Sequence, residues 1–206
     1  STIVIDGVQK LRGCTYSVIA DRIAAATYIS AAASTGGEIS LTGIDSSICD
    51  SFLPVFEQMG CKIYVYSDRL YINASGKLKG VNKIITMPHP GFPTDAQAVI
   101  MAALCKAYGS SIFEENIFES RYRHVDALVK MGADIKVIGK AAVVNGVEKL
   151  YGAKVSATDL RGGAAMAVAG LGAEGVTEVA EIHHIDRGYE DMEKAFSSLG
   201  GKIQRV

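Results

Sequence analysis

Three segments of the chain are apolar on every side when they are drawn as helices, and an aspartate stands at the start of each. The first segment follows Asp21 and covers residues 23–33, the second follows Asp95 and covers 96–105, and the third follows Asp159 and ends at 171. A helix without a polar face has to be surrounded by protein. We therefore expect three buried, alanine-rich helices at the centre of the fold.

The three apolar segments are spaced as an internal repeat. Their aspartates are 74 and 64 residues apart, and two further words recur in the same order. These words are Lys-Leu-x-Gly at 10–13, 77–80 and 149–152, and a Gly-x-x-Ile word that ends at 63, 135 and 203. A period of about 70 residues suits a whole α/β unit. We expect a single domain over residues 1–206, with three repeats at about 1–68, 69–140 and 141–206.

Alternation of hydrophobic and polar positions predicts the strands around each helix. The predicted strands are 2–6, 14–19, 38–42, 62–66, 70–73 and 111–118, with a hairpin over 134–144 that turns at Gly139. Outer helices are predicted at 46–59, where Pro54 is expected to produce a kink, and at 122–131. Each unit thus reads strand, helix, strand, helix, strand, strand.

The third repeat lacks its last strand, and residues 2–6 match that strand in register. We therefore expect the first strand of the chain to complete the last repeat and to close a ring of three units. The predicted fold class is α/β (α+β), with three repeated units around a pseudo-threefold axis and the buried helices in the middle.

The composition limits the classes of function. Of the 206 residues, 49% are hydrophobic and 21% are charged, and the net charge of −1 gives no general attraction to nucleic acid or anionic membranes. No apolar run approaches the length of a membrane span, and the first residues read as a strand and not as a signal peptide, so a cytoplasmic location is expected. The four cysteines have neither metal-ligand nor disulfide-rich spacing and are expected to be buried thiols: Cys14, Cys49, Cys61 and Cys105.

Polar residues that depart from the repeat mark a candidate site. They are Asp95, Arg121, Asp159, Arg161, Asp186 and Arg187. Under threefold symmetry these strand-to-helix junctions meet at one end of the domain, where arginines and carboxylates would bind phosphate or carboxylate groups beside a candidate general base. Plainer alternatives are that Asp95 and Asp159 are helix caps and that 186–188 is a solvated turn.

Other motifs give weaker signals. Three prolines between 88 and 93 stiffen the loop before Asp95, either as a rigid connector or as a wall that aims this carboxylate. His183 and His184, as neighbours on a strand, would face opposite ways and are not expected to share a metal. There is no P-loop, no dinucleotide-binding glycine motif and no serine nucleophile elbow.

Four motifs in combination resemble the UDP-N-acetylglucosamine 1-carboxyvinyltransferase family, the enolpyruvyl transferases of peptidoglycan synthesis. They cover 88–95 (PHPGFPTD), 117–121 with 124–125, 157–161 and 184–190. The resemblance extends over the whole chain, but the family has two similar domains of three repeats, and this chain resembles the C-terminal one. It implies the inside-out α/β domain of enolpyruvyl transferases.

The resemblance implies transfer of the enolpyruvyl group of phosphoenolpyruvate to the 3′-hydroxyl of UDP-N-acetylglucosamine with release of phosphate, without a metal or organic cofactor. Asp95 matches the carboxylate that contacts the sugar hydroxyl and is the favoured base, and Ile117 matches a main-chain contact to the nucleotide sugar. Arg187 matches an arginine that binds phosphoenolpyruvate. Arg121, Asp159 and Arg161 match polar residues that line the closed cleft, while Ser120 replaces a usual asparagine.

The resemblance also indicates what a complete enzyme would need from outside this chain. The family's mobile loop with its cysteine and its Lys-Asn pair belong to the N-terminal domain, so we expect that domain as a partner and no turnover by this chain alone. Two alternatives stay open: half of the related shikimate-pathway transferase, or a non-catalytic module that binds a nucleotide sugar. The motifs at 92–95 and 186–189 favour the nucleotide-sugar enzyme.

Overall fold

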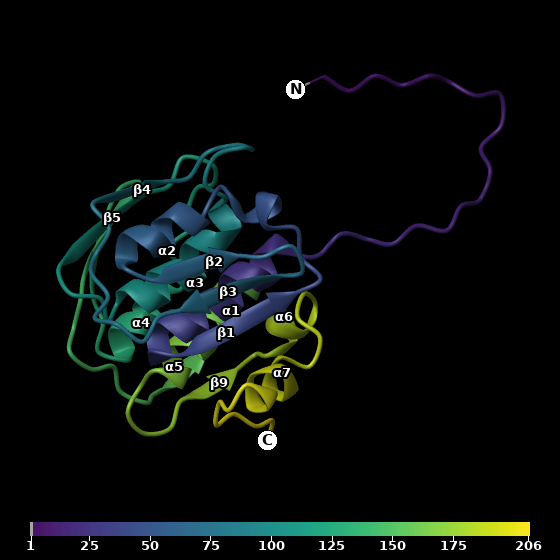
Figure 1. Cartoon of the computed structure of the whole chain (residues 1–206). Coiled ribbons are helices and arrows are strands. Elements are labelled where there is room, and N and C mark those ends of the chain that lie inside the picture. The colour runs from purple at the N-terminus through teal and green to yellow at the C-terminus, as the bar shows by residue number, and fades with distance from the viewer. Residues whose placement is uncertain (1) are drawn as a thin grey trace.

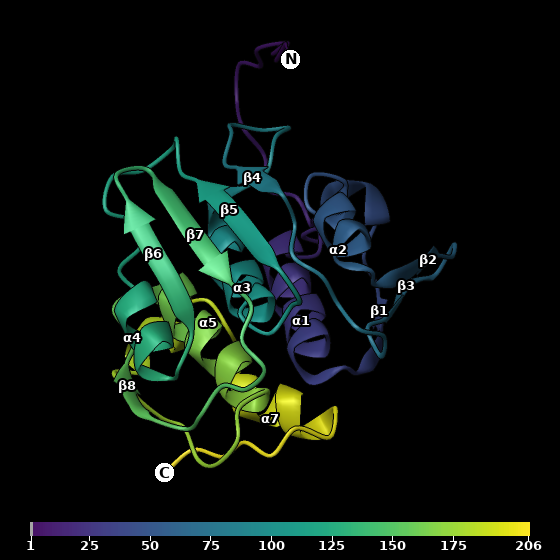
Figure 2. The same ribbon diagram turned by 90° about the vertical axis from the view of Figure 1, so that its left-hand side faces the viewer.

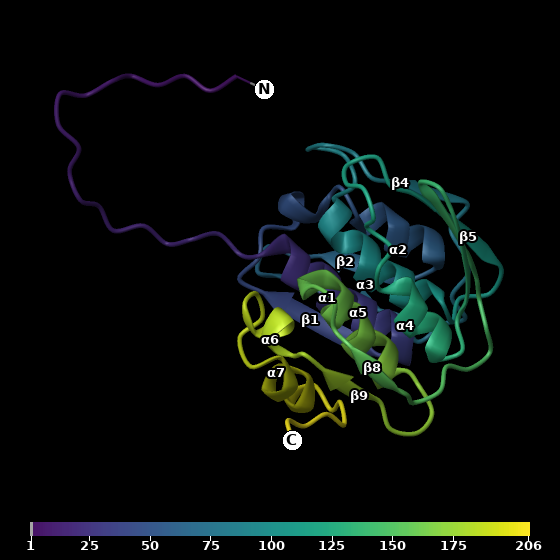
Figure 3. The same ribbon diagram turned by 180° about the vertical axis from the view of Figure 1, so that it is seen from behind.

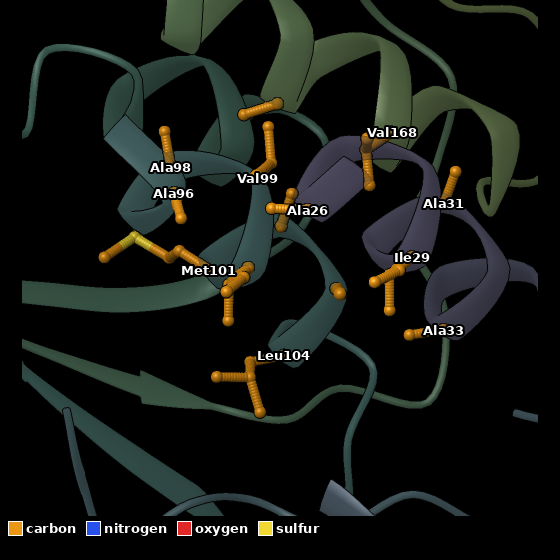
Figure 4. Packing of buried hydrophobic residues seen from close by; sticks show 14 of the residues in the cluster. Ala26, Ile29, Ala31, Ala33, Ala96, Ala98, Val99, Met101, Leu104 and Val168 are labelled. Carbon is orange, nitrogen blue, oxygen red and sulfur yellow. The ribbon is translucent and has the colours of Figure 1, made fainter. Parts of the chain in front are cut away.

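Three buried helices form the centre of the computed structural model, which describes residues 2–206. They are α1 (Arg22–Thr35), α3 (Thr94–Leu104) and α5 (Leu160–Leu171), and each of them contacts the other two (Figure 3). Ala26, Val99 and Val168 belong to one cluster of buried side chains, which Figure 4 shows in close-up. Small side chains allow the helix axes to approach closely. The predicted alanine-rich centre is confirmed.

Three separate sheets surround these helices. The first has the order β1-β3-β2, the second β4-β5-β7-β6, and the third is the parallel pair β8-β9. The strands of the first sheet are β1 (Glu38–Thr42), β2 (Lys62–Val65) and β3 (Arg69–Asn73). Those of the second are β4 (Lys83–Ile85), β5 (Ser110–Glu114), β6 (Asp134–Ile138) and β7 (Ala141–Asn145), and those of the third are β8 (Lys154–Ser156) and β9 (Glu178–Ala180).

In the second sheet, the predicted alternation of hydrophobic and polar positions corresponds to alternation of buried and more exposed side chains. In the antiparallel pair of β5 and β7, Phe113 lies opposite Ala142 and Ser111 lies opposite Val144, and all four side chains are buried. The same pair stands in front of α3 in Figure 2. The predicted hairpin after Asp134 is also present, with Gly139 at the turn in a left-handed conformation (φ 58°) that glycine adopts without strain.

The outer helices are shorter than predicted. Residues 46–59 form two pieces, the 3₁₀ helix η1 (Ser46–Cys49) and α2 (Leu53–Met59). Pro54 lies in the first turn of α2, where a backbone N–H would have had no partner in the helix. A new helix therefore begins just before Pro54, and there is no kink within a single helix. The remaining outer helices are α4 (Val125–Lys130), α6 (His183–Asp186) and α7 (Met192–Ser198).

One predicted strand is shorter than expected, and another predicted strand is a helix. The strand predicted at 111–118 stops at Glu114, because the next side chain, Glu115, accepts hydrogen bonds from the N–H groups of Ile117 and Phe118 and turns the chain. His183 and His184 lie on α6 and not on a strand, and their ring centres are 4.1 Å apart, so the prediction that they face opposite ways is wrong.

The first residues of the chain depart most from the prediction. Residues 2–20 form neither helix nor strand and lead away from the body of the molecule (Figure 1). No backbone hydrogen bond joins them to the rest of the described chain. The predictions of strands at 2–6 and 14–19, and of a ring closed by the first of them, are therefore wrong for this structure. A strand needs a partner for its backbone groups, and alternation alone does not supply one.

Three of the four cysteines are buried as predicted. Burial raises the pKa of Cys49 and of Cys61 to about 11 and that of Cys105 to about 12, so these thiols are inert as nucleophiles. Cys14 is exposed, contrary to the prediction. Within residues 2–206, no helix is long and apolar enough to cross a membrane.

Candidate active site

Two of the three buried helices begin with an aspartate cap. The carboxylate of Asp21 accepts a hydrogen bond from Ile23 N–H at 2.7 Å at the start of α1. Asp159 does the same at the start of α5, where it accepts from Arg161 N–H at 3.0 Å and from Gly162 N–H at 2.9 Å. Each cap satisfies N–H groups that the helix leaves free.

Asp95 lies inside the first turn of α3 and does not cap it. Its Oδ1 is 2.8 Å from Nη2 of Arg121, which follows β5, and its Oδ2 is 3.5 Å from Nη2 of Arg161 in α5. Both arginine side chains are largely buried, at 19% and 14% exposed, while that of Asp95 is 44% exposed. The structure thus holds one carboxylate between two guanidinium groups with part of it open to solvent.

A second set of contacts ties this carboxylate to the other two helices. Arg161 Nη1 donates to the Tyr189 hydroxyl at 3.2 Å, and that hydroxyl is 2.7 Å from Thr27 Oγ1 on α1. The first turns of α3 and α5 and the second turn of α1 are therefore linked by side chains. We call Asp95, Arg121, Asp159, Arg161 and Tyr189 the rim cluster.

Backbone hydrogen bonds and a nearby positive charge lower the pKa of Asp159. Burial alone would raise the pKa of this carboxyl group, but hydrogen bonds from Gly162 and Arg161 N–H, with the charge of Arg121, lower it below the ordinary value. Asp159 is thus an anion at neutral pH. It offsets part of the positive charge of the two arginines.

A buried histidine lies beneath the cap of α5. His124 is 1% exposed, and burial lowers its pKa to about 4, an effect that the negative charge of Asp159 offsets only in part. Its Nε2 has no hydrogen-bond partner within residues 2–206. A Cβ on Gly162 would lie 3.2 Å from Cβ of His124, so glycine allows the first turn of α5 to pack closely against this side chain.

The structure brings some of the predicted site residues together and leaves others apart. Asp95, Arg121, Asp159 and Arg161 meet as predicted. Asp186 does not join them, because it binds Arg205 through two hydrogen bonds of 2.7 and 3.0 Å. Arg187 is exposed at the end of α6, two residues before Tyr189, and its side chain has no hydrogen-bond or ion-pair partner within residues 2–206.

Ile117 stands on the loop that leads from β5 to Arg121. Its N–H donates to Glu115 at 2.9 Å, and its carbonyl oxygen accepts no backbone hydrogen bond from the described residues. If the main chain of Ile117 contacts a ligand, the carbonyl oxygen is therefore the group available for it.

Sequence reasoning assigned no role to three residues that build this site: Glu115, His124 and Tyr189. A signal existed for Glu115. Ser111 and Phe113 face inward on β5, and the same alternation places a carboxylate inside at position 115. Tyr189 and His124 offered no such signal, because their positions depend on how α6 and α4 pack against α5.

The described part of the chain has one hollow beside the rim cluster and another far from it. One of about 420 Å³ borders Arg121 and is lined also by Arg123 and Lys140. Another of about 430 Å³ lies at the opposite ends of α1 and α3, beside Ser34 and Lys106, away from Asp95. No group of three or more His, Cys, Asp or Glu side chains within residues 2–206 is arranged to hold a metal.

Comparison with known proteins shows the family of the chain. A family model described as EPSP synthase (3-phosphoshikimate 1-carboxyvinyltransferase) matches residues 1–196. The chain belongs to this family. UDP-N-acetylglucosamine 1-carboxyvinyltransferase 2 of Caldanaerobacter subterraneus is 47% identical over 206 residues, which are 100% of this chain and 49% of that protein. The enzyme of the same name from Clostridium acetobutylicum is 51% identical over 98% of this chain and 48% of its own length.

Two solved structures share the fold. The enolpyruvyl transferase NikO from Streptomyces tendae superposes with a TM-score of 0.81 at 25% identity, over 91% of this chain and 44% of that protein. EPSP synthase from Acinetobacter baumannii superposes with a TM-score of 0.73 at 16% identity, over 89% and 46%, and this likeness shows the fold alone. The chain spans about half the length of the curated relatives it matches.

Proposed function

We propose that this chain is the C-terminal half of an enolpyruvyl transferase that joins phosphoenolpyruvate to the 3′-hydroxyl of UDP-N-acetylglucosamine and releases phosphate, the first committed step of peptidoglycan synthesis. The observation that carries the proposal is the half-exposed carboxylate of Asp95, held between Arg121 and Arg161 at the first turn of a buried helix. The names of the relatives support the choice of substrates.

Asp95 is the proposed acceptor of the hydroxyl proton. In the addition step, an acid supplied by the other half protonates C3 of phosphoenolpyruvate, the C2=C3 double bond opens, and the sugar oxygen bonds to the electrophilic C2 while its proton passes to Asp95. In the elimination step, the conjugate base of that acid takes a proton back from C3, the double bond forms again, and the bond from C2 to the phosphate oxygen breaks to release phosphate. A carboxylate suffices as the proton acceptor because the carbon under attack is strongly electrophilic.

The arginines supply charge and orientation. Arg121 and Arg161 fix both oxygens of Asp95, and a fixed carboxylate does not have to be reoriented during the reaction. Arg187, whose side chain is exposed without a partner in the described chain, is proposed to bind the carboxylate or phosphate of phosphoenolpyruvate. Asp159 keeps Arg161 in place through the first turn of α5.

The other half of the enzyme is proposed to close the site. In a closed cleft, water is excluded and each charged contact becomes stronger. The rim cluster of this chain faces solvent in part, so we propose that the chain alone does not turn over. We further propose that the complete protein acts in the cytoplasm, without metal or organic cofactor.

Two other functions are weighed against this one. The family model carries the description of the shikimate-pathway enzyme, which favours shikimate 3-phosphate as an alternative acceptor. A non-catalytic module that binds a nucleotide sugar would use the same arginines without turnover.

Competition binding separates the two candidate acceptors, and the phosphate-release assay separates the transferase from a binding module. The chain, combined with the complementary half of the Caldanaerobacter relative, is titrated with UDP-N-acetylglucosamine and with shikimate 3-phosphate by calorimetry. The proposal predicts binding of the nucleotide sugar that shikimate 3-phosphate does not displace. Binding of shikimate 3-phosphate alone would contradict it.

A further inference from the structure

The carboxylate of Glu115 is buried directly behind the rim cluster. It follows the last residue of β5 and is only 2% exposed. Buried carboxylates are rare unless they are fully hydrogen-bonded or paired with a cation. No arginine, lysine or histidine of residues 2–206 forms an ion pair with Glu115, so its partners are neutral donors.

Each oxygen of Glu115 accepts two hydrogen bonds, and the two oxygens hold different parts of the site. Oε2 accepts from Thr94 Oγ1 and from Gln97 Nε2, both at 2.9 Å, which fixes the first turn of α3 around Asp95. Oε1 accepts from the N–H groups of Ile117 at 2.9 Å and Phe118 at 3.0 Å. All four partners donate to the two carboxylate oxygens.

The loop that Glu115 holds is the one that delivers Arg121. The guanidinium of Arg121 lies 5.7 Å from the ring centre of Phe118, and its Nη2 contacts Thr94 O at 3.4 Å as well as Asp95 Oδ1 at 2.8 Å. Glu115 therefore binds Thr94, which precedes Asp95, and the N–H of Phe118, whose ring lies beside the Arg121 guanidinium. A side chain in that place sets the position of Arg121 relative to Asp95.

We infer that Glu115 is a positioning residue of the transferase: it fixes the first turn of α3 to the 116–118 loop so that Arg121 meets Asp95 in one orientation. The inference rests on the proposed function, because it gives Glu115 a role in that reaction. It assigns no contact between Glu115 and a substrate.

The test compares Glu115→Gln with Glu114→Gln in the chain combined with its complementary half. The first change keeps the shape but replaces one acceptor oxygen by an NH₂ group that faces two donors. The second lies one residue earlier, where Glu114 pairs with Lys83 at the surface. We expect Glu115→Gln to lower kcat for phosphate release by about tenfold to a hundredfold with KM for phosphoenolpyruvate little changed, and Glu114→Gln to match wild type.

A readout that does not need activity separates this inference from the proposed function. The NMR signals of the Arg121 guanidinium in the chain itself report its pairing with Asp95, and we expect them to change in Glu115→Gln and not in Glu114→Gln. If wild type is inactive with its complementary half but these signals change, the proposed function fails while the positioning stands. Unchanged signals and unchanged kcat in a folded Glu115→Gln would overturn the inference.

Thr94→Val keeps the inference testable if Glu115→Gln does not fold. It removes one of the four donors and leaves the buried carboxylate in place. We expect a smaller loss of kcat and a smaller change in the Arg121 signals. If Glu115→Gln is unfolded and Thr94→Val behaves as wild type in both measurements, Glu115 is a structural residue only and the inference is wrong.

Discussion

The starts of α1 and α3 carry the same residue type in two different roles. Asp21 is a helix cap whose carboxylate bonds to the N–H of Ile23. Asp95 caps nothing, and its two oxygens face Arg121 and Arg161. The two aspartates come from corresponding places in the predicted repeats. Local sequence therefore does not decide between a cap and a site; the arginines that arrive from other elements do.

The largest expected effect concerns activity. We expect Asp95→Ala to lower phosphate release by the combined halves by about 10²- to 10⁴-fold, the usual contribution of a general base. Asp21→Ala is the matched control, because it removes the same group from the corresponding turn of α1, and it should leave the rate within about twofold of wild type. Steady-state phosphate assays of wild type, Asp95→Ala and Asp21→Ala test this prediction. Equal losses of rate in the two variants would show that Asp95 has no catalytic role beyond that of a helix-start aspartate.

The next effect concerns acid stability. His124 has a pKa of about 4 in the folded chain, against 6.5 as its ordinary value. Below pH 6.5, His124 binds a proton in the unfolded chain but stays neutral in the folded chain. The free energy of unfolding should therefore fall by about 3 kcal/mol between pH 6.5 and 4.

Denaturant titrations at several pH values measure this slope. His124→Asn serves as the comparison, since its unfolding free energy lacks this term while all other groups titrate as before. Identical pH slopes in the two proteins would show that His124 is not held neutral by burial.

The caps themselves should differ in strength. Asp159 bonds to two N–H groups and lies beside Arg121, whereas Asp21 bonds to one. We expect Asp159→Ala to lower the free energy of unfolding by about 2 kcal/mol and Asp21→Ala by about 1 kcal/mol. Thermal or urea unfolding distinguishes them, and a larger loss for Asp21→Ala would reverse the ranking.

The smallest effect is expected for the ion pair that keeps Asp186 away from the rim cluster. Arg205 contacts both Asp186 and Glu193 at the surface. Exposed pairs of this kind contribute little, so Arg205→Ala should leave both the unfolding midpoint and the phosphate-release rate close to wild type. A loss of activity comparable to that of Asp95→Ala would show that Asp186 belongs to the site after all.

Much of the fold could be predicted from local patterns, because those patterns report burial. The apolar helices at 23–33, 96–105 and up to 171 have no polar face, and the hairpin at Gly139 follows from alternation and a turn residue. The segment at 2–6 alternates equally well but has no partner strand in the structure. Pairing is a property of the rest of the molecule and does not appear in the segment itself.

The candidate site could be predicted only in part for the same reason. Asp95, Arg121 and Arg161 stand out as charges at the ends of apolar segments, and threefold symmetry indicates that they meet. Tyr189 was missed because its hydroxyl reaches Arg161 only through the packing of α6 on α5. Asp186 was included as a charged residue at a strand-to-helix junction, yet its carboxylate binds Arg205, which is far from it in sequence, through two hydrogen bonds.

Phosphate release from phosphoenolpyruvate and UDP-N-acetylglucosamine tests the central claim most directly. It is measured with this chain alone, with the complementary half of a relative alone, and with the two combined, in wild-type and Asp95→Ala forms. The account predicts release only from the combined wild-type halves. The two halves are first shown by sedimentation to form a complex that binds the nucleotide sugar. If that complex releases no phosphate, the result would contradict the account and favour a binding module.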